Sequence, residues 1–193
     1  MTTSPEPEVI SFATSSEWSE WLAQNHTLQH GIWLRMYKKG SGIPSINYAQ
    51  ALDEALCYGW IDGQKKSYDD TSWIQRFVPR RAKSVWSQIN CGHIERLTAE
   101  GRMEAPGLQA VEDAKADGRW DAAYASQKSA APPEDFLSEL NKNEAAKGFF
   151  GTLNKANVYA ILYRIQDAKK PETREKRIRT FIEMLARGEK IHG

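Results

Sequence analysis

The sequence predicts an α+β protein: a small antiparallel sheet of about three strands, packed by helices and followed by a helical C-terminal segment. Residues 31–39 alternate apolar and polar side chains, which is the period of a half-buried strand. Residues 60–67 and 72–79 are two further strand-like runs separated by turn-forming residues. Beyond residue 134, apolar side chains recur instead at the spacing of helices.

The N-terminal region predicts a tail and then a helix. Residues 1–13 are polar and contain prolines, so we expect them to form a frayed tail. Ser15 or Ser16 can cap a helix over about residues 16–25, in which tryptophans at the i and i+3 positions form an apolar stripe. A loop that follows residue 39 contains two glycines, lacks a phosphate-binding motif and reads as a simple turn.

Asn47 and Gln50 predict the start of the next helix, because an Asn with Gln three residues later has the form of a capping box. This helix should continue to about Tyr58, where Gly59 ends it. The two strands beyond it should form a hairpin around Asp69 and Asp70, residues that favour turns.

The register of this hairpin decides which side chain faces Asp62. A two-residue loop places Asp62 opposite Phe77, whereas a three-residue loop centred one position earlier places it opposite Arg76. We favour the pairing with Arg76, because a carboxylate that points inward needs a partner.

Two helices are expected after the hairpin. Ser84 can cap the first, with Trp86, Ile89, His93 and Leu97 on its apolar stripe. The second begins near Pro106, buries Leu108, Val111 and Ala114, and ends at Gly118.

The remainder of the chain predicts a separate helical segment. Residues 125–133 are rich in Ala, Ser and Pro and have the composition of a linker. We therefore expect a core domain at residues 14–124 and a helical segment at 134–191 that can dock on it as one unit. Asn154 and Pro171 mark the starts of its last two helices.

Composition excludes several classes of function. The 26 basic and 25 acidic side chains nearly cancel, so the net charge does not favour nucleic acid or membrane as a partner. No apolar run is long enough to insert into a membrane, and the N-terminus does not resemble an export signal, so we expect a cytoplasmic protein. Cys57 and Cys91 are far apart in sequence, which disfavours a disulfide framework or a zinc site.

No standard catalytic or nucleotide-binding motif is present, and we expect no cofactor and no metal. The chemistry that remains is a cationic and aromatic set within residues 60–93, a stretch with six basic and three acidic side chains. Arginine offers a planar fork of donors for phosphate or carboxylate, and a helix capped by Ser84 adds free N–H groups. An Arg–Asp network that stabilises the fold explains the same residues equally well. The candidate ligand-binding residues are Trp60, Asp62, Arg76, Arg80, Arg81, Lys83 and Trp86.

Several blocks resemble a known family. EALCYGWIDG, WIQRFVPRRAKSVWSQIN, LTAEGRMEAPGL and AKADGRW are similar to the central region of the YdeI/OmpD-associated, bacteriocin-protection proteins, and the stretch from LNKANVYAILYRIQ resembles their C-terminal helical segment. The resemblance implies a small cytoplasmic α+β protein linked by name to bacteriocin or antimicrobial-peptide resistance. It implies no catalytic residue.

Three functional hypotheses follow. The first is a non-enzymatic protection factor against bacteriocin or antimicrobial stress that binds an anionic small molecule or acidic partner through an Arg/Lys/Trp surface. The second is an enzyme acting on a phosphorylated or carboxylated small molecule, with Asp62 or Glu54 as base, and the third is a weak nucleic-acid binder. A deep pocket that contains Asp62 or Glu54 beside Arg76 would favour the enzyme, and an open basic face with exposed tryptophan would favour binding. The sequence does not decide whether the protein forms a homo-oligomer.

Overall fold

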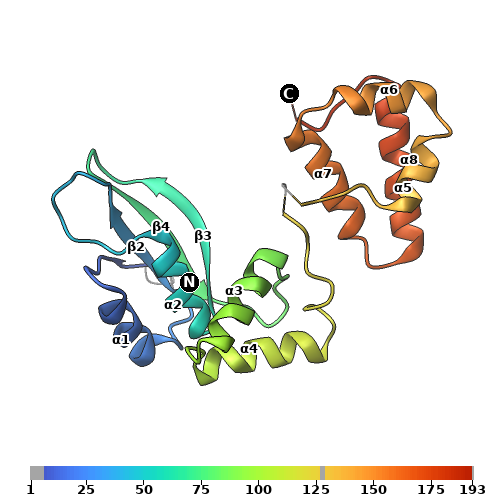
Figure 1. Ribbon diagram of the computed structural model, residues 1–193. Helices are drawn as coiled ribbons and strands as arrows, with labels where there is room; N and C mark the ends of the chain where they lie inside the picture. The colour runs from blue at the N-terminus through green and yellow to red at the C-terminus, as the bar shows by residue number, and fades with distance from the viewer. Residues whose placement is uncertain (1–6, 127–128, 193) are drawn as a thin grey trace, which may run out of the picture. The chain divides into compact units, whose positions relative to one another are not determined.

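The computed structural model describes residues 7–126 and 129–192 of the chain, which form two compact units (Figure 1). The first unit runs to Trp86 and also includes Asn90–Ala122, and the second consists of Ser87–Ile89 and the chain from Ala123 onward. The first holds the sheet and the second holds a set of helices, so the predicted α+β class is confirmed. Residues 1–6 of the expected tail, and residues 127–128 of the expected linker, lie outside the described residues.

The sheet has four strands rather than about three. They are β1 (Val9–Ile10), β2 (Ile32–Tyr37), β3 (Trp60–Ser67) and β4 (Ser72–Pro79), in the spatial order β1-β2-β4-β3. Strand β1 lies within the stretch predicted to be a tail and pairs with β2 in parallel, which makes the sheet mixed rather than antiparallel. Two residues are too few to show a strand period, so only the edge of β2 makes this segment a strand.

The predicted pairing of Asp62 with Arg76 is wrong. Asp62 lies opposite Phe77, and beyond a bulge between Asp62 and Lys65 the register shifts by one residue, so that Lys65 lies opposite Gln75. A bulge inserts an unpaired residue into one strand, and loop-length reasoning alone does not detect it.

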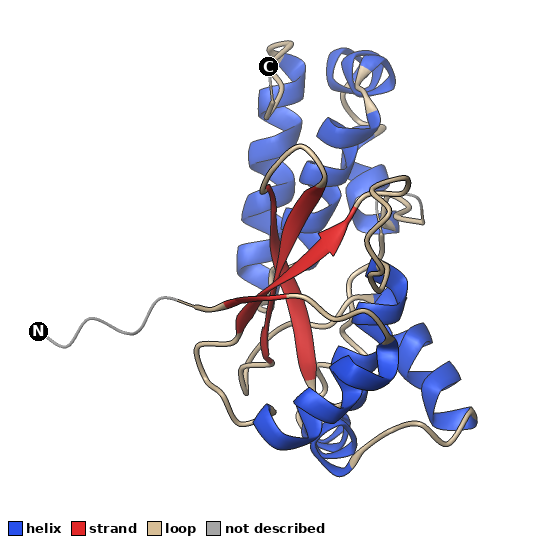
Figure 2. Cartoon of the chain, turned by 90° about the vertical axis from the view of Figure 1, so that its left-hand side faces the viewer, coloured by secondary structure: helices blue, strands red, loops and turns tan. Residues whose placement is uncertain are grey.

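Helices α1 (Ser15–Asn25) and α2 (Tyr48–Cys57) pack on one face of the sheet (Figures 1 and 2). Thr14, not a serine, caps α1, since its side chain accepts a hydrogen bond from the Glu17 amide. The predicted capping box of α2 is present, with both reciprocal hydrogen bonds between Asn47 and Gln50.

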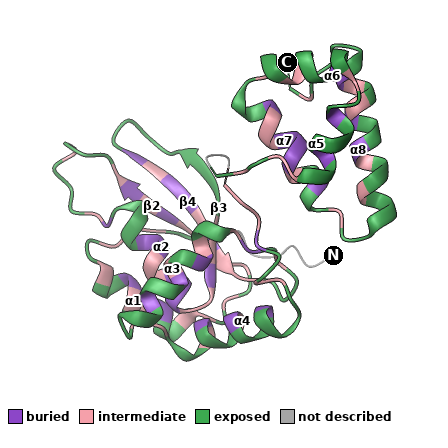
Figure 3. Ribbon diagram, turned by 45° about the vertical axis from the view of Figure 1, so that its right-hand side comes forward, coloured by how far each residue is buried: buried purple, intermediate pink, exposed green. Residues whose placement is uncertain are grey.

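The core of the first unit is aromatic. Trp18, Trp60 and Phe77 are fully buried, and the Trp18 ring contacts both others edge-on, with centroids 6.2 and 5.9 Å away. The indole N–H of Trp18 donates to the Ala51 carbonyl oxygen at 3.1 Å, which fixes α1 on α2. Figure 3 shows buried residues on the sides of these helices that face the sheet and exposed residues on their outer sides.

Helices α3 (Gln88–Ala99) and α4 (Ala105–Ala116) follow the hairpin. The first starts three residues later than a helix capped by Ser84 would, so Ser84 does not cap it and Trp86 precedes it. The prediction that Ile89 and Leu108 lie on the buried apolar sides of these helices is wrong, because both side chains are exposed.

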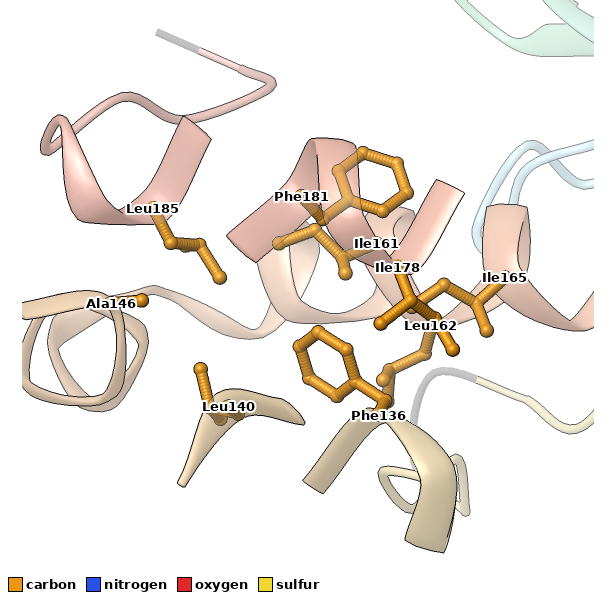
Figure 4. Close-up of a cluster of buried hydrophobic side chains, with 9 residues drawn as sticks. All are labelled: Phe136, Leu140, Ala146, Ile161, Leu162, Ile165, Ile178, Phe181 and Leu185. Carbon is orange, nitrogen blue, oxygen red and sulfur yellow. The ribbon is translucent and has the colours of Figure 1, made fainter. Parts of the chain in front are cut away.

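The second unit contains α5 (Glu134–Leu140), α6 (Glu144–Thr152), α7 (Lys155–Gln166) and α8 (Pro171–Ala186). Asn154 caps α7 and Pro171 opens α8, as predicted. All four helices contribute to one apolar cluster (Figure 4). Its buried members are Phe136, Leu140, Ala146, Ile161, Leu162, Ile165, Ile178, Phe181 and Leu185.

Candidate functional site

The structure divides the predicted ligand-binding residues among several environments. Trp60 belongs to the core, where its indole N–H donates to the His26 carbonyl oxygen at 2.8 Å. Asp62 accepts a hydrogen bond from the Tyr48 hydroxyl at 2.8 Å, on the face of the sheet that carries α2. Burial and this hydrogen bond raise the pKa of Tyr48. Trp60 therefore has a structural role, and Asp62 holds α2 to the sheet.

Arg76 lies on the opposite face of the sheet. It pairs across the strands with Trp33, and its Nη2 donates to the His30 carbonyl oxygen. The Nη1 atom is buried and has no acceptor among the described residues. Burial lowers the pKa of the Arg76 guanidinium because it disfavours the charged form.

The loop that joins β4 to α3 gathers the remaining predicted residues. The Arg80 amide donates to the Gly59 carbonyl oxygen at 2.9 Å, and the guanidinium carbon of Arg80 lies 3.6 Å from the centroid of the Trp86 ring. The Nη1 of Arg80 also donates to the Ser84 hydroxyl at 3.4 Å. The loop is therefore folded back on itself by a cation–π contact rather than by a helix cap.

Arg119, which was not among the residues predicted from the sequence, also binds this loop. Its Nη1 donates to the Ser84 carbonyl oxygen at 3.2 Å, and its Nε donates to the Asp117 carboxylate at 2.7 Å. The residue stands in the AKADGRW block, but 39 positions separate it from Arg80, and no local pattern links the two.

These residues surround a small cavity of about 60 Å³. We call it the loop cavity; its lining is Arg80, Arg81, Ala82, Ser84, Trp86, Ala110, Asp113 and Arg119. Lys83 belongs to the same loop but does not line the cavity. Three of the seven predicted residues thus meet at one place.

Two donors at the loop cavity stand out. Trp86 is 2% exposed, and its indole N–H is buried with no acceptor among the described residues. Arg81 is exposed, and none of the hydrogen bonds that hold the loop within the described chain uses its side chain. A buried N–H without an acceptor costs about 1–3 kcal/mol, which makes it an unusual feature of a folded protein.

The carboxylates proposed as catalytic bases have other partners. Glu54 accepts a hydrogen bond from Arg102 Nη2 at 2.7 Å, and its neighbour Asp53 accepts one from Arg96 Nη2 at the same distance. Neither Glu54 nor Asp62 lines the loop cavity. Within residues 7–126 and 129–192, no cluster of three His, Cys, Asp or Glu side chains could hold a metal ion. No helix in that part of the chain is both long and apolar enough to span a membrane.

Comparisons with known proteins found two family matches. A model described as a domain of unknown function, DUF8412, matches residues 10–110, which is more than half of the chain. A second model, described as Bacteriocin-protection, YdeI or OmpD-Associated, matches residues 129–188. The resemblance stated from the sequence is thus confirmed for the C-terminal segment, whereas three of the four central blocks lie within the DUF8412 match.

The searches of curated proteins and of solved structures returned no match. The loop cavity is lined by residues inside and outside the DUF8412 match, since Arg80 lies within residues 10–110 and Arg119 lies beyond them. On these matches, the chain belongs to the DUF8412 family through residues 10–110 and carries a Bacteriocin-protection, YdeI or OmpD-Associated domain at residues 129–188.

Proposed function

We propose that this protein is a cytoplasmic, non-enzymatic binding protein that takes a small oxyanion, a phosphate, sulfate or carboxylate group, in the loop cavity. The observation that carries the proposal is the convergence of three guanidinium groups around a cavity whose tryptophan has an unused indole N–H. An oxyanion would supply acceptors to these donors, and charge-assisted hydrogen bonds of this kind contribute about 1.5–3 kcal/mol each.

The size of the loop cavity fits a single oxyanion group rather than a large ligand. Its volume is about 60 Å³. One water molecule needs about 10–15 Å³ of such a volume, so the cavity could hold about four. A tetrahedral oxyanion has five heavy atoms and matches this space. A larger molecule would have to keep its remainder outside, next to the exposed Arg81.

The charges around the loop cavity also favour an anion, by a narrow margin. Arg80, Arg81 and Arg119 line it, and the acidic side chains near them are Asp113, in the lining, and Asp117, paired with Arg119. Asp113 also accepts a hydrogen bond from Gln109 at 2.8 Å. The net charge is therefore +1 with Asp113 ionised, and removing that carboxylate should strengthen anion binding.

Binding fits this geometry better than catalysis does. Glu54 and Asp62, the two candidate bases, are engaged elsewhere by Arg102 and Tyr48. A general base must lie within hydrogen-bond reach of the proton that it takes, and neither reaches the loop cavity.

The test is a thermal-shift and calorimetric titration with phosphate, sulfate and acetate at constant ionic strength. Binding to the folded state stabilises it by about 2.7 kcal/mol when the ligand is at 100 times its Kd. Arg81→Gln should weaken binding roughly 10- to 100-fold, the equivalent of one charge-assisted hydrogen bond. The unliganded variant should keep wild-type stability, because Arg81 does not hold the loop.

Lys83→Gln is the matched control, since it removes the same charge from the same loop but not from the cavity lining. It should bind like wild type, whereas Asp113→Asn should bind about two- to fivefold more tightly, as for one exposed charge pair. Equal losses in Arg81→Gln and Lys83→Gln would mean general screening and would overturn the assigned site. The absence of any anion-specific stabilisation would overturn the function.

We propose the protection role for the whole protein, on the description of the family matched at residues 129–188. A strain that lacks the gene should be more sensitive to bacteriocins, and the wild-type gene should restore resistance. Failure of Arg81→Gln to restore it would link protection to the loop cavity, whereas full rescue by this variant would separate the two.

A further inference from the structure

A second surface of the first unit has a different chemistry. The face of the sheet opposite α1 and α2 presents Trp33, Arg35 and Tyr37 from β2, because these alternate with the buried side chains of that strand. Arg76 of β4 lies opposite Trp33, and Lys66 of β3 lies opposite Ile74 on the same face. We call the following residues the hairpin platform: Trp33, Arg35, Tyr37, Lys66, Tyr68 and Arg76.

Cations and aromatic rings interleave across the hairpin platform. Lys66 Nζ lies 4.5 Å from the centroid of the Trp33 ring, and the guanidinium carbon of Arg76 lies 5.7 Å from it. The guanidinium carbon of Arg35 lies 4.6 and 4.8 Å from the rings of Tyr37 and Tyr68. Positive charge and π-surface therefore occupy the same area.

The rings of the hairpin platform are accessible: Tyr68 is 49% exposed and Trp33 is partly exposed. A further cation–π contact of the hairpin, with Lys65 Nζ 4.1 Å from the centroid of the Trp73 ring, lies on the other face of the sheet, because Trp73 pairs with the buried Met36. Helices α1 and α2 of this unit pack on the other face of the sheet (Figure 2).

Charge is concentrated here in a way that the composition conceals. Residues 33–39 and 64–76 together contain six basic and two acidic side chains, a local net charge of +4 in a chain whose formal net charge is +1. One of the two acids, Asp69, is already bonded to Arg35 at 2.5 Å. The hairpin platform holds three of the six basic side chains, Arg35, Lys66 and Arg76, which exceed the single carboxylate that is bonded to it.

We propose that the hairpin platform binds single-stranded nucleic acid. A flexible strand offers phosphates at short intervals for the spread cations, and unpaired bases that can stack on the exposed rings. A small anion would meet only one or two of these cations, and the paired bases of a duplex are not free to stack. The proposal concerns other residues than the loop cavity and does not depend on it.

The lysine contacts with the rings do not block such a ligand. An exposed cation–π contact contributes roughly a two- to fivefold preference, whereas stacking of one base on an aromatic side chain contributes roughly five- to 150-fold. A base can therefore displace the amine of Lys66 from the Trp33 ring, and this side chain is long enough to move to a phosphate.

The test is fluorescence anisotropy of a labelled 12-nucleotide poly(dT) and poly(U) with the full chain between 50 and 200 mM salt. For about three phosphates neutralised on a single strand, log Kobs should fall against log salt with a slope of about −2. Lys66→Gln should reduce this slope by about 0.7, whereas Lys65→Gln, on the other face of the same hairpin, and Lys169→Gln, exposed in the other unit, should leave it unchanged.

Tyr68→Leu separates stacking from charge, since it removes an exposed ring without changing the net charge. It should weaken binding at least about fivefold while the salt slope stays constant. Failure of both oligonucleotides to bind at 50 mM salt would overturn the proposal. So would wild-type affinity in Tyr68→Leu, which would mean charge attraction alone, or preferred binding to anionic lipid vesicles in competition. Arg81→Gln should bind the oligonucleotides like wild type, so failure here is distinguishable from failure of the loop cavity.

Discussion

The junction of α2 and α4 allows a sharp prediction, because it contains a glycine that no other residue can replace without movement. Gly107, in the first turn of α4, lies against the C-terminal end of α2. A Cβ atom at this position would stand 2.1 Å from the Cys57 carbonyl oxygen and 2.9 Å from that of Leu56. Both are backbone atoms, so no side-chain rotation can relieve the contact. We predict that Gly107→Ala destabilises the first unit.

The magnitude follows from two opposing effects. Overpacking costs about 1–3 kcal/mol, and a clash with backbone atoms belongs at the upper end of that range. Alanine gains up to about 1 kcal/mol over glycine in a helix. The expected net loss is therefore about 2 kcal/mol, or a fall of about 1 M in the urea midpoint for an m-value near 2 kcal/mol/M.

Gly92→Ala is the matched control. Gly92 is also helical, it is exposed, and a Cβ atom there would meet nothing within 4 Å. This variant should be more stable than wild type by about 0.8–1 kcal/mol through helix propensity alone.

Tryptophan fluorescence is the assay for both variants, because all seven tryptophans lie in the first unit and the second contains none. A urea midpoint of Gly107→Ala within about 0.3 M of wild type would contradict the predicted clash. That result would mean that α4 can move away from Cys57 at no cost, and the close approach would then not be required by the fold.

Two further predictions concern the second unit and the hairpin turn. Phe136→Ala should lower the stability of the second unit by about 3–5 kcal/mol, as for large buried aromatics. Far-UV circular dichroism should report an early loss of helix, while the unfolding transition seen by tryptophan fluorescence stays in place. A single shifted transition in both signals would contradict independent unfolding of the two units. Hydrogen bonding, first from Ser72 and then from Thr71, lowers the pKa of Asp69 to about 2. A lowered pKa stabilises the fold above the unfolded value of about 3.9 and loses this effect as the pH falls toward 2. Asp69→Asn should therefore flatten the fall of the urea midpoint between about pH 4 and pH 2, and an unchanged profile would contradict the role of this carboxylate.

Elements whose signals are local could be predicted from the amino-acid sequence. The capping box of Asn47 and Gln50, the alternation in β2, and the starts of α7 at Asn154 and α8 at Pro171 are all read from residues within a few positions of one another. The structure reproduces each of them, because capping hydrogen bonds and side-chain alternation depend on neighbouring residues. The family of the C-terminal segment was equally visible in its ordered blocks.

Features that depend on residues far apart in the sequence could not be predicted and are set by tertiary packing. The bulge after Asp62 sets the hairpin register, and β1 forms a strand by pairing with the edge of β2. Neither the bulge nor β1 has a local signature in the sequence. The same holds for the candidate site, where sequence reasoning placed Trp60 on a binding surface and the fold buries it beside Trp18. Arg119 reaches the loop cavity only because α4 and the turn after it return the chain to Arg80. Burial and long-range convergence are properties of packing, and a linear pattern carries the residue types for a site without the distances that assemble it.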